Sequence, residues 1–165
     1  MPQIQFRLFD HSDALSLRLV YESAVSQLTV GEYNLAQRTA WIQASADPKY
    51  WLQVLERIQP TVTLVDGEIA GYFDLQPDGL IDHFYVAAAF AHQGIARVMM
   101  DEILQRAQTR NLPEIYAYVS LTAQPFFTRY GFEMVYRQNV EVGGQQLEND
   151  FTKKFRRQTG NGTEN

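Results

Sequence analysis

The stretch from Ile81 to Gln108 constrains the fold most, because a buried strand there leads through a short turn into a helix. Residues 81–86 are rich in β-branched and aromatic side chains, which predicts a strand. From Gly94 onward the apolar residues recur at helical spacing. A helix that starts directly after such a turn has unpaired backbone N–H groups at the positive end of its dipole. We therefore expect this junction to bind a phosphate group.

Upstream of this stretch the sequence predicts one strand followed by three helices. Asp47 and Pro48 are typical of a helix start, because an aspartate side chain caps the first turn and proline suits the first helical position. Pro60 is expected to end the last of these helices. The strand is predicted at residues 4–8, and the helices at 14–28, 35–44 and 49–57.

The pattern changes from helical to strand-like at Thr61. Asp66 and Gly67 separate two strand-like runs and supply the positive φ angles that a tight hairpin turn needs. A second turn, which ends at Gly79, leads into the strand at 81–86. Three consecutive antiparallel strands are therefore expected, the first two at residues 61–65 and 68–75.

The last third of the chain predicts a second group of strands. A strand at 115–119 follows the helix and is expected to run parallel to 81–86, because a helical crossover connects them. Gly143 and Gly144 predict a hairpin turn. A short helix is expected at 120–130, and the two strands of the hairpin at 131–142 and 147–155. The fold class is thus mixed α and β. We expect one domain over residues 1–155 and a disordered tail at 156–165, which has nothing apolar to bury.

Composition and charge argue against several functions. The 165 residues include no cysteine, which excludes a thiol nucleophile, and we expect no metal centre. The net charge of −5, from 19 acidic and 14 basic residues without a basic block, argues against nucleic-acid binding. No apolar run approaches the roughly 18 residues of a membrane span, and the first residues do not have the pattern of a signal peptide. A cytoplasmic protein is expected.

Two motifs resemble those of the GNAT superfamily of N-acetyltransferases. The run AHQGIA at 91–96 is similar to the family's pyrophosphate loop, whose pattern is Gln or Arg, two variable residues, Gly, one variable residue, and then Gly or Ala. Gly94 and Ala96 match that pattern, whereas Ala91 stands where the family has Gln or Arg. The second motif runs from Ser120 to Phe132 and resembles the family segment with Asn, Ala and Tyr before a Gly-Phe pair. In this segment Ala123, Gly131 and Phe132 match, while Ser120 replaces the Asn and Phe127 replaces the Tyr.

The resemblance implies a GNAT-like fold, with a mostly antiparallel central sheet, helices on both faces and one parallel pair of strands that splay apart. It implies acetyl-CoA as co-substrate, with the pantetheine arm in the gap and the pyrophosphate on the backbone N–H groups of residues 93–97. The cofactor-binding residues expected from it are Phe84, Tyr85, Val86, Ala91, His92, Gln93, Gly94, Ile95, Ala96, Arg97, Ser120, Ala123, Phe126 and Phe127.

The chemistry implied by the resemblance is acyl transfer to a primary amine by direct attack. Such a reaction needs a neutral amine, a donor for the developing oxyanion and a proton for the departing thiolate. The backbone N–H of Val86 is the candidate oxyanion donor. Asp82 is the first candidate for amine recognition or for deprotonation through a water, and His83 is the second. Alternatively, Asp82 is a surface carboxylate and His83 a histidine of the core.

The group that protonates the thiolate is not obvious, because Phe127 lacks the hydroxyl of the family's tyrosine. Tyr130, one helical turn further on, and Ser120 carry hydroxyl groups. Tyr130 also fits a packing role. A coenzyme A thiolate is stable enough near neutral pH to leave with little help.

The acceptor is expected between the early helices and the final hairpin. Glu22, Tyr33 and Trp41 are candidates for its binding, since aromatic rings and carboxylates suit an ammonium. A small-molecule amine and a peptide amine both stay open, as does a homodimer. Two other functions remain as alternatives: a GNAT-like module that binds acyl-CoA without catalysis, and an unrelated nucleotide-binding domain. The sequence contains neither a Walker motif nor a GxGxxG motif, which argues against the nucleotide-binding domain.

Overall fold

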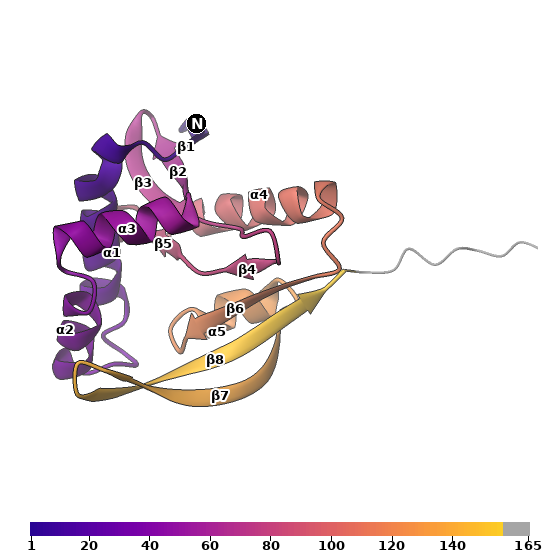
Figure 1. The fold of residues 1–165 in the computed structure, drawn as a ribbon. Coiled ribbons are helices and arrows are strands. Elements are labelled where there is room, and N and C mark those ends of the chain that lie inside the picture. The colour runs from indigo at the N-terminus through magenta and orange to yellow at the C-terminus, as the bar shows by residue number, and fades with distance from the viewer. Residues whose placement is uncertain (157–165) are drawn as a thin grey trace, which may run out of the picture.

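The strands form two four-stranded sheets in the computed structural model, which describes residues 1–156 (Figure 1). The first sheet is antiparallel and has the order β1 (Ile4–Leu8), β2 (Thr61–Val65), β3 (Glu68–Phe73) and β5 (Phe84–Val86). The second has the order β4 (Leu80–Ile81), β6 (Glu114–Ser120), β8 (Gln145–Phe155) and β7 (Glu133–Val142). Only β4 and β6 are parallel among the described strands.

Five α-helices of the described chain pack around these sheets. They are α1 (Ala14–Leu28), α2 (Leu35–Gln43), α3 (Pro48–Ile58), α4 (Ile95–Thr109) and α5 (Gln124–Arg129), with short 3-10 turns η1 (His11–Asp13) and η2 (Ala88–Phe90). Figure 1 shows the long β7–β8 hairpin ending next to α2, so the last strands of the chain lie beside one of its first helices. The mixed fold class and the order of elements expected from the sequence are confirmed.

The core lies on two faces of the first sheet. Neighbouring residues of a strand point to opposite faces, and Tyr72 and Phe73 of β3 are both fully buried. Tyr72 packs with Trp51 and Leu55 against α1 and α3, whereas Phe73 packs with Met99 and its neighbours against α4. Burial of each such side chain stabilises the fold by about 1.5–3 kcal/mol. The two clusters hold the first sheet between two layers of helices.

Local signals in the sequence explain where α3 begins and ends. The side chain of Asp47 accepts hydrogen bonds from the backbone N–H groups of Lys49 (2.8 Å) and Tyr50 (3.1 Å), and Pro48 occupies the first helical position. The helix stops at Gln59, whose φ of 46° is left-handed. These contacts set the direction in which Trp51 enters the core.

The strand expected at residues 81–86 is not continuous, which corrects the prediction. It breaks at Asp82 and His83 into β4, which belongs to the second sheet, and β5, which belongs to the first. At the break a side chain replaces a backbone acceptor: Oδ1 of Asp74 accepts hydrogen bonds from the N–H groups of Asp82 (2.8 Å) and His83 (2.7 Å). The chain therefore crosses from one sheet to the other at this point.

Several other boundaries differ from the sequence-based expectations. The strand expected at 68–75 ends at Phe73, and the last helix covers only Gln124–Arg129 because a turn occupies residues 121–123. Arg156, the first residue of the expected tail, donates from its backbone N–H to the carbonyl of Pro113 at 2.9 Å. The rest of that tail, 157–165, lies outside the described residues. None of the helices described for residues 1–156 has the length and apolar character to span a membrane.

Candidate functional site

The two sheets diverge on one side of the β4–β6 pair and leave a gap. Residues Leu80 and Ile81 of β4 pair with Tyr116 and Ala117 of β6. After Ala117, the neighbour of β6 is no longer β4 but β5, the next strand in the chain. Within the described chain, β5 pairs with β3 and not with β6. Strands β5 and β6 therefore open toward their carboxyl ends, as the resemblance implied.

The backbone of β5 presents free donors to this gap. Tyr85 is paired with Tyr72 of β3, and two residues further on the N–H of Ala87 donates to the carbonyl of Ala70 at 2.8 Å. Antiparallel ladders alternate between hydrogen-bonded and non-bonded pairs, so Val86, which lies between, points its N–H away from β3. The same alternation turns the N–H of the residue before Tyr85 toward the gap. The edge of β5 is thus left unpaired where β6 has moved away.

The start of α4 supplies a second set of unpaired donors next to β5. Gly94, just before the helix, has a φ of +82°, and His92 has a φ of +60°, so the loop doubles back tightly before the first turn. The first N–H of α4 that reaches a carbonyl is that of Val98, which donates to Gly94 at 3.3 Å. Within the described chain, the N–H groups of residues 93–97 donate to no protein acceptor. This is the geometry that suits a phosphate.

The loop residues expected at the cofactor site differ in exposure. His92, Gln93, Gly94 and Arg97 are exposed, whereas Ile95 is buried and holds the helix start against the core. The N–H of Ala91 is not free, because it donates to the carbonyl of Ala88 at 3.2 Å. The exposed part of the loop therefore begins directly after Ala91.

Two cavities meet at the gap. The first has a volume of about 280 Å³ and lies toward β4, β7 and β8, and the second has about 220 Å³ and lies toward α1, α4 and α5. Both are lined by residues of β5, β6 and α5. The shared lining residues are Trp41, Phe84, Tyr85, Ser120, Ala123 and Phe127. Val86, Ala96 and Phe126 line the second cavity only, so it adjoins the helix start. The gap thus connects a site beside unpaired backbone donors with a separate, aromatic site.

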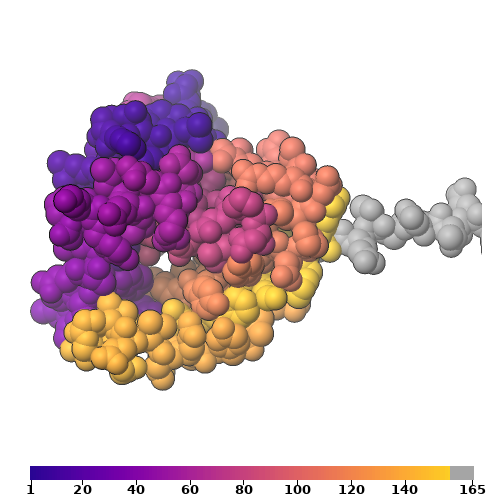
Figure 2. Space-filling view, in the orientation of Figure 1, coloured from indigo at the N-terminus to yellow at the C-terminus, as the bar shows by residue number. Residues whose placement is uncertain are grey.

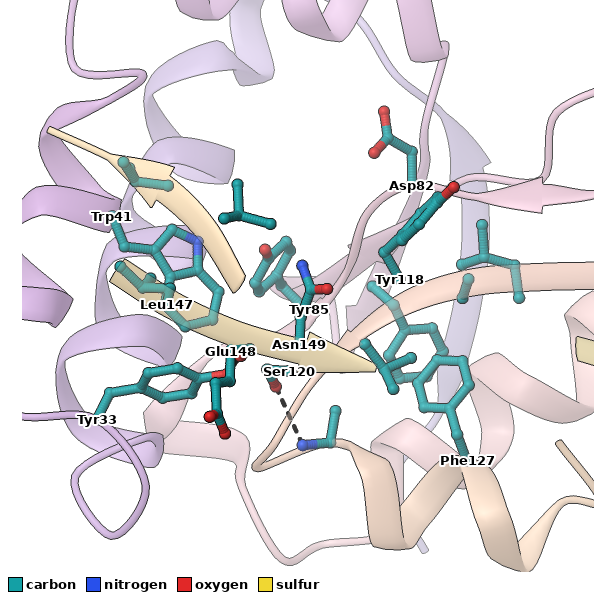
Figure 3. Close-up of a pocket in the computed structure, with 17 residues that line it drawn as sticks. Tyr33, Trp41, Asp82, Tyr85, Tyr118, Ser120, Phe127, Leu147, Glu148 and Asn149 are labelled. Carbon is teal, nitrogen blue, oxygen red and sulfur yellow. Dashed lines mark hydrogen bonds between the residues drawn. The ribbon is translucent and has the colours of Figure 1, made fainter. Parts of the chain in front are cut away.

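Figure 3 shows the first cavity, whose walls come from both ends of the chain. Tyr33 and Trp41 form one wall, with ring centroids 5.3 Å apart. The hydroxyl of Tyr33 donates to the carbonyl of Glu148 on β8 and accepts from the N–H of Leu121 at 3.0 Å. Tyr33 thereby joins the helical layer to the final hairpin. Figure 2 shows a hollow on this face of the molecule, between the purple helices and the orange hairpin.

The structure separates the two candidate bases. Asp82 lines the first cavity at its rim, where its carboxylate is 3.1 Å from Arg57 and about a third of the side chain is exposed (34%). His83 points into the opposite aromatic cluster, 5.6 Å from the ring of Tyr85, and its Nδ1 lies 3.1 Å from the hydroxyl of Tyr72. Burial lowers the pKa of His83 to about 4, so its imidazole is neutral at pH 7. His83 lines neither cavity.

No phenol from α5 reaches the gap in the described structure. Phe127 is buried against Phe84 and Phe132, with ring centroids 5.7 and 4.9 Å away. Tyr130 packs on Phe126 at 5.0 Å and lines neither cavity. Ser120, by contrast, lines both cavities, and its hydroxyl accepts a hydrogen bond from the N–H of Ala123 at 3.1 Å.

The structure brings together only some of the residues expected to bind the acceptor amine. Tyr33 and Trp41 line the first cavity, whereas Glu22 lies outside it and pairs with Arg18 at 2.8 Å. Sequence reasoning missed Tyr118 and Asn149, which line the cavity from β6 and β8. The run Leu-Glu-Asn-Asp at 147–150 was the available signal, because three polar residues in succession are unusual for a strand that closes a core.

Asp74 is a second residue that sequence reasoning missed. Its side chain is buried (2% of the residue is exposed) beneath the break between β4 and β5, and its Oδ2 accepts from the Nε2 of Gln76 at 3.1 Å. Burial raises the pKa of Asp74 to about 6, although the hydrogen bond from the N–H of His83 acts in the opposite direction. The carboxyl group supports the backbone of Asp82 and thereby the rim of the first cavity. Within residues 1–156 no cluster of three or more His, Asp or Glu side chains is suited to hold a metal ion.

Comparison with known proteins places this arrangement in a family. Residues 29–148 match the model of the acetyltransferase (GNAT) domain. An uncharacterised N-acetyltransferase of Escherichia coli K12, YafP, is 27% identical over 153 residues, which cover 93% of this chain and 97% of the relative.

Two solved structures share the fold. A GCN5-related N-acetyltransferase from Rhodopseudomonas palustris superposes with a TM-score of 0.88 at 24% identity, covering 94% of this chain and 97% of that one. The PaiA N-acetyltransferase from Thermoplasma acidophilum, solved in complex with coenzyme A, has a TM-score of 0.73 at 15% identity, with coverage of 93% and 99%.

Proposed function

Because this chain belongs to the GNAT acetyltransferase family, we propose that it transfers the acetyl group of acetyl-CoA to a primary amine by direct attack in a ternary complex. One observation carries the proposal: unpaired N–H groups on the edge of β5 and at the start of α4 border the same gap. A chain of amides can pair with the first set and a diphosphate with the second. The relative from Thermoplasma acidophilum, which shares the fold, is solved with coenzyme A.

In this proposal the second cavity holds the pantetheine arm and the first holds the amine. The N–H groups of residues 93–97 bind the pyrophosphate, Phe84 and Val86 hold the arm through the free backbone edge of β5, and Tyr85 lines the cavity beside it. Ala96, Ser120, Ala123, Phe126 and Phe127 enclose it. Acetyl-CoA supplies an activated acetyl group. The N–H of Val86 is placed to donate to the oxygen of that group as negative charge develops there, which is where a fixed donor accelerates acyl transfer most.

Asp82 is the proposed base. Its carboxylate stands at the rim of the amine cavity beside Arg57, so it attracts the protonated amine and takes its proton through a water. The nitrogen lone pair then forms the C–N bond as the C–S bond breaks, and the proton released from nitrogen balances the charge of the departing thiolate. His83 is the less suitable base, because its ring faces the aromatic cluster and it lines neither cavity.

A non-catalytic module that binds acyl-CoA is the second candidate function. The specific observation in its favour is Phe127, which is buried and has no hydroxyl for the thiolate. Catalysis does not need that group near neutral pH, where the thiolate of coenzyme A is a competent leaving group. We also propose that residues 1–155 act as a single domain, since the gap is built from both halves of the chain.

A paired measurement of binding and turnover tests the proposal. Calorimetry should detect binding of coenzyme A, and acetyl-CoA with a broad panel of amines should release free thiol. Binding without thiol release for any amine would support the non-catalytic module. Absence of binding would overturn both functions. Tighter binding of ATP or NAD than of acetyl-CoA would instead favour the unrelated nucleotide-binding domain.

A further inference from the structure

The charge of the first cavity limits which amines it accepts. Its lining residues within the described chain include Asp82 and Glu148 but no lysine and no arginine. The cation beside the rim, Arg57, is more than half exposed (57%) and is already paired with Asp82. A carboxylate that entered this cavity would leave water without gaining a cationic partner, and it would approach Asp82. The cavity therefore disfavours acceptors that carry an acid group near the amine.

The remaining walls are apolar and aromatic. Rings of Tyr33, Trp41, Tyr85 and Tyr118 stand on several sides in Figure 3. Val140 and Val142 of β7 and Leu147 of β8 complete the wall that faces the helices. With about 280 Å³, the cavity is just below the range for small-ligand sites, roughly 300–1,000 Å³. Such a site fits a small apolar body rather than a long or highly charged chain.

One polar group in these walls has no partner. The side-chain amide of Asn149 makes no hydrogen bond to residues 1–156, and its Oδ1 is shielded from solvent. In the β6–β8 ladder Asn149 lies opposite Ser120, so both side chains stand on the same face of the second sheet, beside the gap. A buried amide without a partner is costly in a folded protein, about 1–3 kcal/mol, unless a ligand or water completes it. An amino group in the cavity would do so.

We propose that the acceptor is a primary amine on a small, uncharged, apolar body without a carboxylate, and that Asn149 is the residue that positions its amino group. This inference rests on the proposed function, since it assigns the amine to the first cavity. The aromatic walls bind the body, Asn149 accepts a hydrogen bond from the nitrogen, and the absence of a basic side chain excludes free amino acids.

Matched pairs of amines that differ only by a carboxylate test the acceptor class. Thiol release from acetyl-CoA should be measured with 2-phenylethylamine against phenylalanine, and with 3-methylbutylamine against leucine. We expect kcat/KM to favour the plain amine by about tenfold or more in each pair, because the acid group meets Asp82 without a cation. Equal or faster acetylation of the amino acids would overturn the inference while leaving the proposed function intact.

The panel also separates failure of the inference from failure of the function. Spermidine and a peptide with a free N-terminus are included as polar acceptors. Thiol release with these alone would overturn the acceptor class but not the acetyltransferase activity. No thiol release with any amine would overturn the inference together with the proposed function.

Two substitutions of Asn149 test its role. Asn149→Leu removes the amide at similar volume and should raise KM for 2-phenylethylamine about tenfold, the effect of one lost hydrogen bond to a buried partner, while kcat at saturation is retained and Tm does not fall. Asn149→Asp keeps an acceptor oxygen and should bind the amine at least as well as the native protein. A merely structural role predicts a lower Tm for Asn149→Leu without a change in KM, and that result would overturn the assignment.

Discussion

Oδ1 of Asp74 lies 2.7 Å from the backbone nitrogen of His83 and accepts its hydrogen bond, at the point where the chain passes from the second sheet to the first. The same oxygen accepts from the N–H of Asp82 at 2.8 Å. A regular strand would satisfy these donors through backbone carbonyls. The carboxylate thus makes the break between β4 and β5 possible, and with it the gap that borders β5.

Replacement of Asp74 should therefore reduce the free energy of unfolding in proportion to the number of hydrogen-bond acceptors that are lost. Asp74→Ala leaves two partly buried N–H groups without their acceptor and should lower the free energy of unfolding by about 2–4 kcal/mol. Asp74→Asn keeps one carbonyl oxygen and should cost less than half as much. Denaturant unfolding measures both. Asp101→Asn on the exposed side of α4 is the control and should change nothing. Equal losses for Ala and Asn at position 74 would contradict the role of the oxygen.

The pH dependence of stability should show Asp74 and His83 acting in opposite directions. Burial raises the pKa of Asp74 from 3.8 to about 6, so the unfolded chain binds fewer protons there and stability falls as pH rises through this interval. Burial lowers the pKa of His83 from 6.5 to about 4, so stability rises with pH between 4 and 6.5. Each slope is at most about 1.4 kcal/mol per pH unit, and the two partly cancel.

Single substitutions should separate the two slopes. The free energy of unfolding is measured from pH 4.5 to 7.5 for the native protein, Asp74→Asn and His83→Gln. Relative to the native protein, Asp74→Asn should gain stability more steeply with pH, and His83→Gln should lose it. Asp82, Arg57, Tyr21, Tyr72 and Tyr85, the other titratable groups near this pair among the described residues, are unchanged in every variant. Parallel profiles for all three proteins would show that neither group titrates in this window.

Asp82→Asn should reduce turnover without affecting stability. The ion pair with Arg57 is largely exposed, and such pairs contribute about 0–1 kcal/mol. Loss of the proposed base should lower kcat by about 10²-fold or more. Arg57→Ala is the matched control, because it breaks the same ion pair and keeps the carboxylate. Full turnover of Asp82→Asn at saturating amine would eliminate Asp82 as the base.

Gly94 and Gly144 form a matched pair for testing the loop before α4. Both have φ near +80° (82° and 80°), and an added Cβ would meet nothing within 4 Å at either position. Substitution by alanine should therefore cost both variants a similar strain of about 1–2 kcal/mol. Only Gly94→Ala should also weaken coenzyme A binding, by about tenfold or more, because it displaces the donors at the start of α4. Equal affinities in calorimetry would disprove this use of the loop.

Features set by neighbouring residues in the sequence were predictable. Asp47 with Pro48 marked the start of α3, Asp66 with Gly67 marked the β2–β3 turn, and the helical spacing after Gly94 marked α4. In each case the residues that give the signal belong to the element they specify or lie directly next to it. The parallel pairing of β4 with β6 followed from the helix between them.

Features that depend on distant residues were not predictable. Asp74 lay inside the strand expected at 68–75 and gave no signal of its own, because the N–H groups of its partners at 82 and 83 lose their backbone acceptors only when two sheets separate. Asn149 enters the first cavity because the β7–β8 hairpin turns back beside α2, a contact between residues more than a hundred positions apart. The side of the strand on which His83 lies could be inferred, but the aromatic cluster around it could not.

The parallel seam between β4 and β6 contains only two residue pairs, Leu80–Tyr116 and Ile81–Ala117. Each additional residue pair would move the point where β4 and β6 separate by about 3.3 Å along the strands, and each pair removed would move it back by the same distance. In the proposed function, the length of this seam sets the depth of the gap that receives the acyl group.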